Sequence, residues 1–136
     1  MKMCGYMKKI LKWVGFGFLV FIAVIMVYAF LGKDQTLALQ ISPVNLSGIP
    51  DGKYTGVYDC FRWSNTVKVT VMDNRITDIE IVKAPNGRYG IEMDLESRII
   101  DAQSPAVDAV SGATADSKAF LKAVENALQN AQPASQ

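Results

Sequence analysis

The chain has 136 residues, which leaves room for one small domain and an anchor. Its formal net charge is +1, which gives no reason to expect a nucleic-acid partner. It contains no histidine, which removes His-based triads and most zinc and haem sites, so no metal site is predicted. Its two cysteines, Cys4 and Cys60, form no C-x-x-C motif, so thioredoxin-like and iron–sulfur sites have no support.

The first predicted element is a membrane-spanning helix over residues 13–31. Every residue in this run is apolar or small, and about 20 such residues cross a hydrocarbon core as a helix. Lysines at positions 2, 8, 9 and 12 precede the run without any acidic residue among them. Lys33 and Asp34 follow the run, and their opposite charges cancel. The lysine excess predicts a single-pass protein of the cell membrane, with residues 1–12 cytoplasmic and the chain after Leu31 extracytoplasmic.

A cleaved signal peptide is the alternative interpretation of this apolar run. The apolar part of a signal peptide is about 7–15 residues long and ends at a small-x-small site. Here the run is longer, and the nearest such site, Thr36-Leu37-Ala38, lies well past its end. These features favour an anchor that is not cleaved.

Residues 32–50 contain glycine and proline without a clear period and are predicted to be a linker. The domain follows over residues 51–130, with 131–136 as a tail. Its first part predicts three antiparallel strands. The alternation is clearest in the second, where Val67, Val69 and Val71 share one face, and in the third, where Ile79 and Ile81 do. The strands are predicted over residues 52–59, 66–72 and 75–83.

Two helices complete the predicted domain. In residues 91–103, Ile91, Leu95 and Ile99 recur every four positions, as they do on the buried face of a helix. After a loop that contains Pro105, residues 115–130 repeat the pattern. The predicted fold class is therefore α+β: a small antiparallel sheet with two packed helices, preceded by one transmembrane helix.

The candidate site is Ser111-Gly112-Ala113-Thr114, where the chain enters the last predicted helix. The first N–H groups of a helix lack internal partners and carry about half a positive charge, and small residues leave them open to an anion such as phosphate. The alternative is structural: Ser111, Thr114 or Asp116 caps the helix and Gly112 makes the turn.

The stretch DAVSGAT, residues 108–114, resembles the attachment motif of the FMN-binding domain family. That family includes the flavin-carrying subunits of the sodium-pumping NADH:quinone reductase and of the Rnf electron-transfer complex. Further stretches are similar to the family in the same order: DGKYTG at 51–56, the hairpin VKVTVMDNRITDIEIV, QS at 103–104 and VDAVSGATADSKAFLKAVENAL.

The resemblance implies that the Thr114 hydroxyl is joined to FMN through a phosphoester made by a separate flavin transferase. It also implies that Ser111, Gly112 and Ala113 shape the turn around the phosphate, and that Asp108 is part of what the transferase recognises. One departure is Asp116, which stands where such domains often have another threonine.

The implied function is that of an electron carrier between a membrane donor and an external acceptor, not a stand-alone enzyme. The FMN ring supplies the chemistry, so Thr114 needs no base beside it. Two alternatives stay open: a domain that binds FMN without a covalent bond, and a flavin-free adhesion or regulatory module with the same fold. The aromatic residues Tyr58, Phe61 and Trp63, together with Tyr89 before the first helix of the domain, are candidates for contact with the flavin ring or for the core and its rim.

Overall fold

The computed structural model describes residues 3–85 and 89–132, and the chain forms two units, residues 1–31 and 32–136. The first unit is the helix α1 (Met3–Phe30). Its length and apolar composition are sufficient to cross a membrane.

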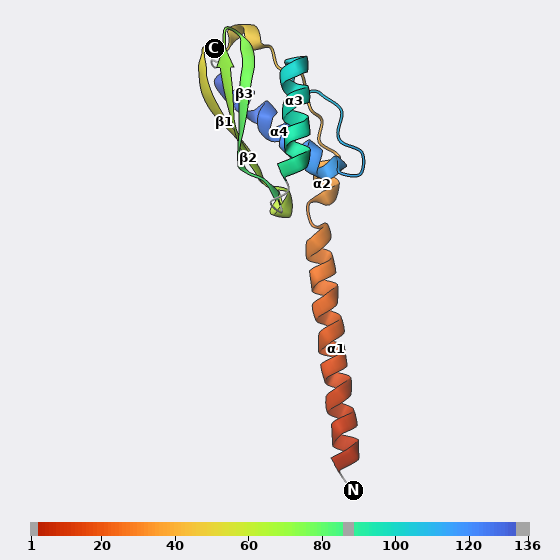
Figure 1. Ribbon diagram of the computed structural model, residues 1–136. Coiled ribbons are helices and arrows are strands. Elements are labelled where there is room, and N and C mark those ends of the chain that lie inside the picture. Colours follow the sequence, from red (N-terminus) through yellow and green to blue (C-terminus); the bar gives the residue numbers. More distant parts are fainter. Residues whose placement is uncertain (1–2, 86–88, 133–136) are drawn as a thin grey trace. The chain divides into compact units, whose positions relative to one another are not determined.

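The second unit is an α+β domain, which confirms the predicted fold class. Its three strands form one antiparallel sheet in the order β1-β2-β3. Helix α4 packs across β1 and β2, and α3 contacts β3 and α4 (Figure 1). The elements are α2 (Lys33–Leu37), η1 (Leu46–Gly48), β1 (Gly52–Tyr58), η2 (Phe61–Trp63), β2 (Asn65–Met72), β3 (Arg75–Lys83), α3 (Tyr89–Ala102) and α4 (Thr114–Ala131).

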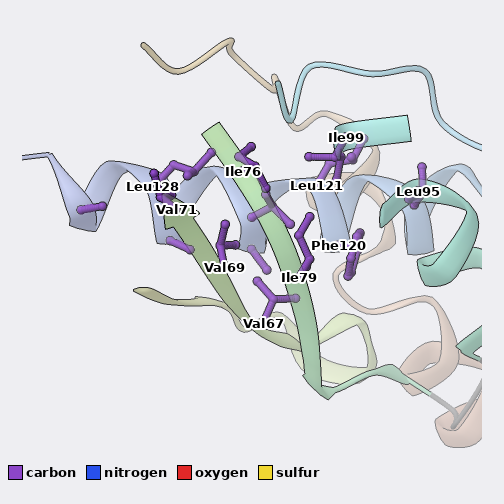
Figure 2. Packing of buried hydrophobic residues seen from close by; sticks show 14 of the residues in the cluster. Val67, Val69, Val71, Ile76, Ile79, Leu95, Ile99, Phe120, Leu121 and Leu128 are labelled. Atoms are coloured by element: carbon purple, nitrogen blue, oxygen red, sulfur yellow. The ribbon is translucent and has the colours of Figure 1, made fainter. Parts of the chain in front are cut away.

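The core lies between the sheet and the two long helices. Val67, Val69 and Val71 of β2 are fully buried, as their alternation predicts, and they face the apolar side of α4 (Figure 2). Ile76 of β3 is also buried, although it lies three positions before Ile79. A register shift after Thr70 makes this possible, because one extra residue in β3 restores the inward direction.

Helix α4 lies directly on β1, and Gly56 allows that contact. A Cβ atom at Gly56 would overlap the carbonyl oxygen of Ala123 and lie 2.5 Å from the backbone nitrogen of Ala127. Small residues line the helix side of the contact as well, since Ala119, Ala123 and Ala127 are all fully buried. The close approach fixes the position of α4 on the sheet, and with it the position of the helix N-terminus.

Residues 32–50, predicted as a linker, belong to the compact unit. Ile49 is buried in the core, and the buried Thr36 hydroxyl lies 3.0 Å from the Tyr58 hydroxyl. The Lys118 ammonium of α4 donates hydrogen bonds to the carbonyl oxygens of Leu37 and Leu39. These contacts hold α2 beside the N-terminal half of α4.

Gln103 ties the loop that precedes the motif to the sheet. Its side-chain amide accepts a hydrogen bond from the Ile76 nitrogen at 2.7 Å and donates one to the Ile76 carbonyl oxygen at 2.9 Å. The amide thus pairs with the backbone of β3 as a neighbouring strand would. This gives the QS pair of the sequence a structural role.

Candidate functional site

The four-residue motif forms a turn that leads into α4. The Ala113 nitrogen donates a hydrogen bond to the Val110 carbonyl oxygen at 3.0 Å, and Gly112 has a φ of +80°. Glycine adopts this left-handed conformation without steric cost, so the structure confirms that Gly112 makes the turn. Ala113 occupies the N-cap position, and Thr114 is the first residue of the helix.

Ser117 holds this turn from inside the helix, a role that the sequence pattern did not reveal. Its buried hydroxyl accepts a hydrogen bond from the Val110 nitrogen at 3.0 Å, and its own nitrogen donates to the Ala113 carbonyl oxygen at 2.9 Å. The sequence signal was a serine on the apolar face of an amphipathic helix. Such a hydroxyl needs a partner when it is buried.

Ala113 occupies the N-cap position of α4 and makes no side-chain capping hydrogen bond. Ser111 and Thr114 are both exposed. The Thr114 hydroxyl is therefore accessible beside the positive end of the helix.

The motif borders a pocket of about 370 Å³ at this end of α4. Most of the Trp63 side chain is buried, with 7% of the residue exposed, and its Nε1 has no hydrogen-bond partner in the described part of the chain. Trp63 therefore contributes only a small exposed part of its side chain to the pocket wall, while its Nε1 is buried. The pocket is lined by Lys33, Leu37, Trp63, Gly112, Ala113, Thr114, Ala115 and Asp116.

Two other predicted site residues, Ser111 and Asp108, do not line this pocket. Ser111 is exposed next to Gly112 but is not among the lining residues. Asp108 is exposed and borders a separate cavity of about 290 Å³, beside Lys118. Of the aromatic cluster, only Trp63 lines the Thr114 pocket.

Comparison with known proteins bears on what this pocket holds. Residues 63–129 match the family model described as the FMN-binding domain. These residues form an FMN-binding domain. The match confirms the family that the motif predicted, and it includes both Trp63 and Thr114.

Two curated proteins are similar to this chain. One is an uncharacterized protein of Treponema pallidum (strain Nichols), 32% identical over 71% of this chain and 27% of its own length. The other is the NADH:fumarate oxidoreductase of Klebsiella pneumoniae (strain 342), 37% identical over 46% of this chain and 7% of its own length. The chain thus spans only a small part of each relative.

The residues around the pocket fit FMN in part. The start of α4 suits a phosphate group, and the pocket volume lies in the range of about 300–1,000 Å³ typical of small-molecule sites. Lys33 adds a positively charged side chain to the lining. Asp116 disfavours an anion, because its carboxylate lines the same pocket and would repel a phosphate group there.

A second carboxyl group lies close enough to interact with Asp116. Glu92 of α3 is 2% exposed, and its Oε2 has no hydrogen-bond partner among the described residues. Burial raises the pKa of Glu92 above its ordinary 4.5, a backbone N–H opposes the rise, and the Asp116 charge adds to it. A neutral Glu92 would leave less negative charge near the start of α4.

We predict that Glu92→Gln stabilises the domain at neutral pH. The raised pKa means that the folded protein prefers the protonated Glu92. The wild type therefore loses free energy of unfolding as the pH rises from about 4.5 through the folded pKa, whereas the glutamine variant does not. Urea denaturation of both proteins in detergent across this pH range measures the difference.

Asp116→Asn tests the cause of this effect. Removing the Asp116 charge lowers the pKa of Glu92, so the pH window in which stability is lost should narrow. If Glu92→Gln is less stable than the wild type at pH 7, the ionised Glu92 has a stabilising partner and the assignment is wrong.

Proposed function

We propose that this protein is a membrane-anchored electron-transfer flavoprotein that carries FMN on Thr114 through a phosphoester. The family match and the NADH:fumarate oxidoreductase relative support FMN binding and electron transfer. The observation that supports the finer proposal is the exposed Thr114, which lines one pocket together with Ala113, Lys33 and Trp63.

Each lining group has a distinct role in this proposal. The first N–H groups of α4 and the Lys33 ammonium stabilise the phosphate charge. Trp63 offers the exposed part of its indole to the ring system. The Arg62 guanidinium lies 4.6 Å from the Trp63 ring centroid. When bound, FMN takes up one or two electrons. The protein then provides position and partial exclusion of water.

Thr114 is expected to act as an acceptor in a reaction that another enzyme performs. The hydroxyl is exposed at a helix start, so a flavin transferase has access to it. The chain contains no histidine that could activate this hydroxyl. The donor and acceptor of electrons are proposed to be a membrane component and an extracytoplasmic one, respectively.

We predict that Thr114→Val is folded but colourless when it is co-expressed with a flavin transferase. Valine keeps the β-branched shape and removes the hydroxyl oxygen, so stability should change by less than about 1 kcal/mol. Thr114→Ser keeps an oxygen and should accept flavin. Intact-mass spectrometry of the wild type should show the added mass of one FMN less one water.

Ser97→Ala is the control, because it removes an exposed hydroxyl of α3 that lies outside the motif. This variant should load flavin as the wild type does. Covalent flavin on Thr114→Val would assign the attachment to another residue. A yellow wild-type protein without added mass would mean that FMN is bound non-covalently, and a colourless one would favour the flavin-free module.

We predict that Asp108→Asn slows flavin loading without changing the melting temperature. Asp108 is exposed and lies outside the Thr114 pocket, so it is available to a modifying enzyme and contributes little to the core. The loading rate with purified transferase measures this effect. Asp101→Asn, an exposed acid on α3, is the control. Equal rates for all three proteins would leave Asp108 as a loop residue only.

The extracytoplasmic orientation is a further prediction, and it depends on the lysine asymmetry around residues 13–31. Protease added to intact spheroplasts should remove the domain and leave a membrane-bound fragment of about 40 residues or fewer, since the accessible chain starts after the span. Immunoblotting with an N-terminal tag detects this fragment. A domain that is protected until the membrane is lysed has the opposite orientation.

A further inference from the structure

The pocket that contains Thr114 is connected to the apolar helix by a very short length of chain. Lys33 lines the pocket and lies two residues after Leu31, the last residue of the apolar run. Consecutive Cα atoms are about 3.8 Å apart, so the Cα atoms of Leu31 and Lys33 are separated by at most about 8 Å. The headgroup layer on each side of a bilayer is about 5–7 Å thick. Lys33 therefore lies in or next to this layer for any angle between helix and domain.

The loop around η2 lies against the first residue of the domain. A Cβ atom at Gly32 would lie 2.6 Å from the Cys60 sulfur and 2.9 Å from Cδ2 of Phe61. Phe61 has a φ of +50°, which is uncommon for a bulky residue, and 54% of its surface is exposed. An exposed aromatic ring is therefore held beside Gly32, one residue after the apolar run.

Two more exposed apolar side chains lie at the same end of the sheet. Val57 of β1 pairs with Thr66 at the start of β2. On the other side of Thr66, β3 pairs through Lys83, the neighbour of Val82. The two valines therefore lie on either side of Thr66. Both are about half exposed, at 50% and 53%. Among the described residues after Leu31, the large apolar side chains that are exposed are Val57, Phe61, Met72, Val82 and Met93. Three of these five lie at the η2 end, where α2 is also found (Figure 1).

We propose that Val57, Phe61 and Val82 form a surface that contacts the headgroup layer of the bilayer in which α1 is anchored. The partner of this surface is a lipid membrane. The proposal rests on the membrane anchor of the proposed function but not on flavin attachment. Its consequence is that a group on Thr114 lies at the level of the lipid headgroups, within reach of membrane-embedded partners.

Burial of apolar side chains, and not attraction between charges, is expected to hold this surface at the membrane. Among the described residues, the basic ones near this end include Lys33, Arg62 and Lys83, and the acidic ones include Asp34, Asp59 and Asp116. The signs nearly balance, so attraction to anionic lipids adds little. An amphipathic surface of this kind gains most from transferring apolar side chains out of water. Contact is therefore expected in vesicles of zwitterionic phosphatidylcholine as well as in anionic ones.

Spin labels at two equally exposed positions test the proposal. The full-length chain, with Cys4→Ser and Cys60→Ser, receives a nitroxide at Phe61→Cys or at Met72→Cys and is reconstituted in phosphatidylcholine vesicles. Met72 is the matched control, since it is 52% exposed and lies at the other end of β2, about 20 Å away along the strand. Power-saturation EPR compares the accessibility of each label to oxygen and to a water-soluble nickel complex.

The Phe61 label should show an oxygen-to-nickel accessibility ratio several-fold higher than the Met72 label. A label at Val82→Cys should behave like the Phe61 label, and it provides the test if Phe61→Cys does not fold. Equal ratios at the two ends would overturn the proposal, and so would a Phe61 label shielded from both reagents, because protein would then cover it.

The result is separable from the proposed function. The same labels on Thr114→Val should give the same ratios, because the measurement needs no flavin. A chain that loads FMN but shows no lipid contact would reject only this proposal. A chain with lipid contact that takes no flavin would reject only the flavin attachment.

Discussion

The close contact between β1 and α4 at Gly56 is the constraint on which the site depends. A side chain at this position would collide with the backbone of α4 at Ala123 and Ala127. With glycine there, the alanine side of the helix lies flat on the strand, and the direction of α4 across the sheet is fixed. The N-terminus of α4 then emerges beside Trp63, whose ring packs against Ala115 and Ala119. The pocket is a consequence of where this helix can lie.

Charge at the start of α4 is a balance of opposing contributions. The helix N-terminus and Lys33 favour an anion, whereas Asp116 disfavours one. Glu92 would add a further negative charge, but burial and the neighbouring Asp116 raise its pKa and favour the neutral form. The start of α4 therefore places a helix N-terminus and Lys33 near two carboxyl groups, and burial favours the neutral form of one of them, Glu92.

Short periodic patterns were sufficient for the elements of the domain. The alternation of Val67, Val69 and Val71 and the four-residue repeats of the two helices predicted β2, α3 and α4 closely. Two features could not be found in this way. Ile76 points inward only because of a register shift opposite Thr70, and strict alternation excludes such a shift. Residues 32–50 have no period, so their packing through Ile49 and Thr36 left no local signal.

The sequence by itself determined that Thr114 stands at a helix start behind a glycine turn, since the motif and the helix repeat are local patterns read from neighbouring residues. It also determined that an apolar segment precedes the domain. Only the tertiary structure decided which distant side chains meet Thr114. Lys33, Leu37 and Trp63 reach the same pocket through hydrogen bonds and packing between segments far apart in the chain. Such contacts depend on the three-dimensional path of the backbone, which no short sequence period encodes.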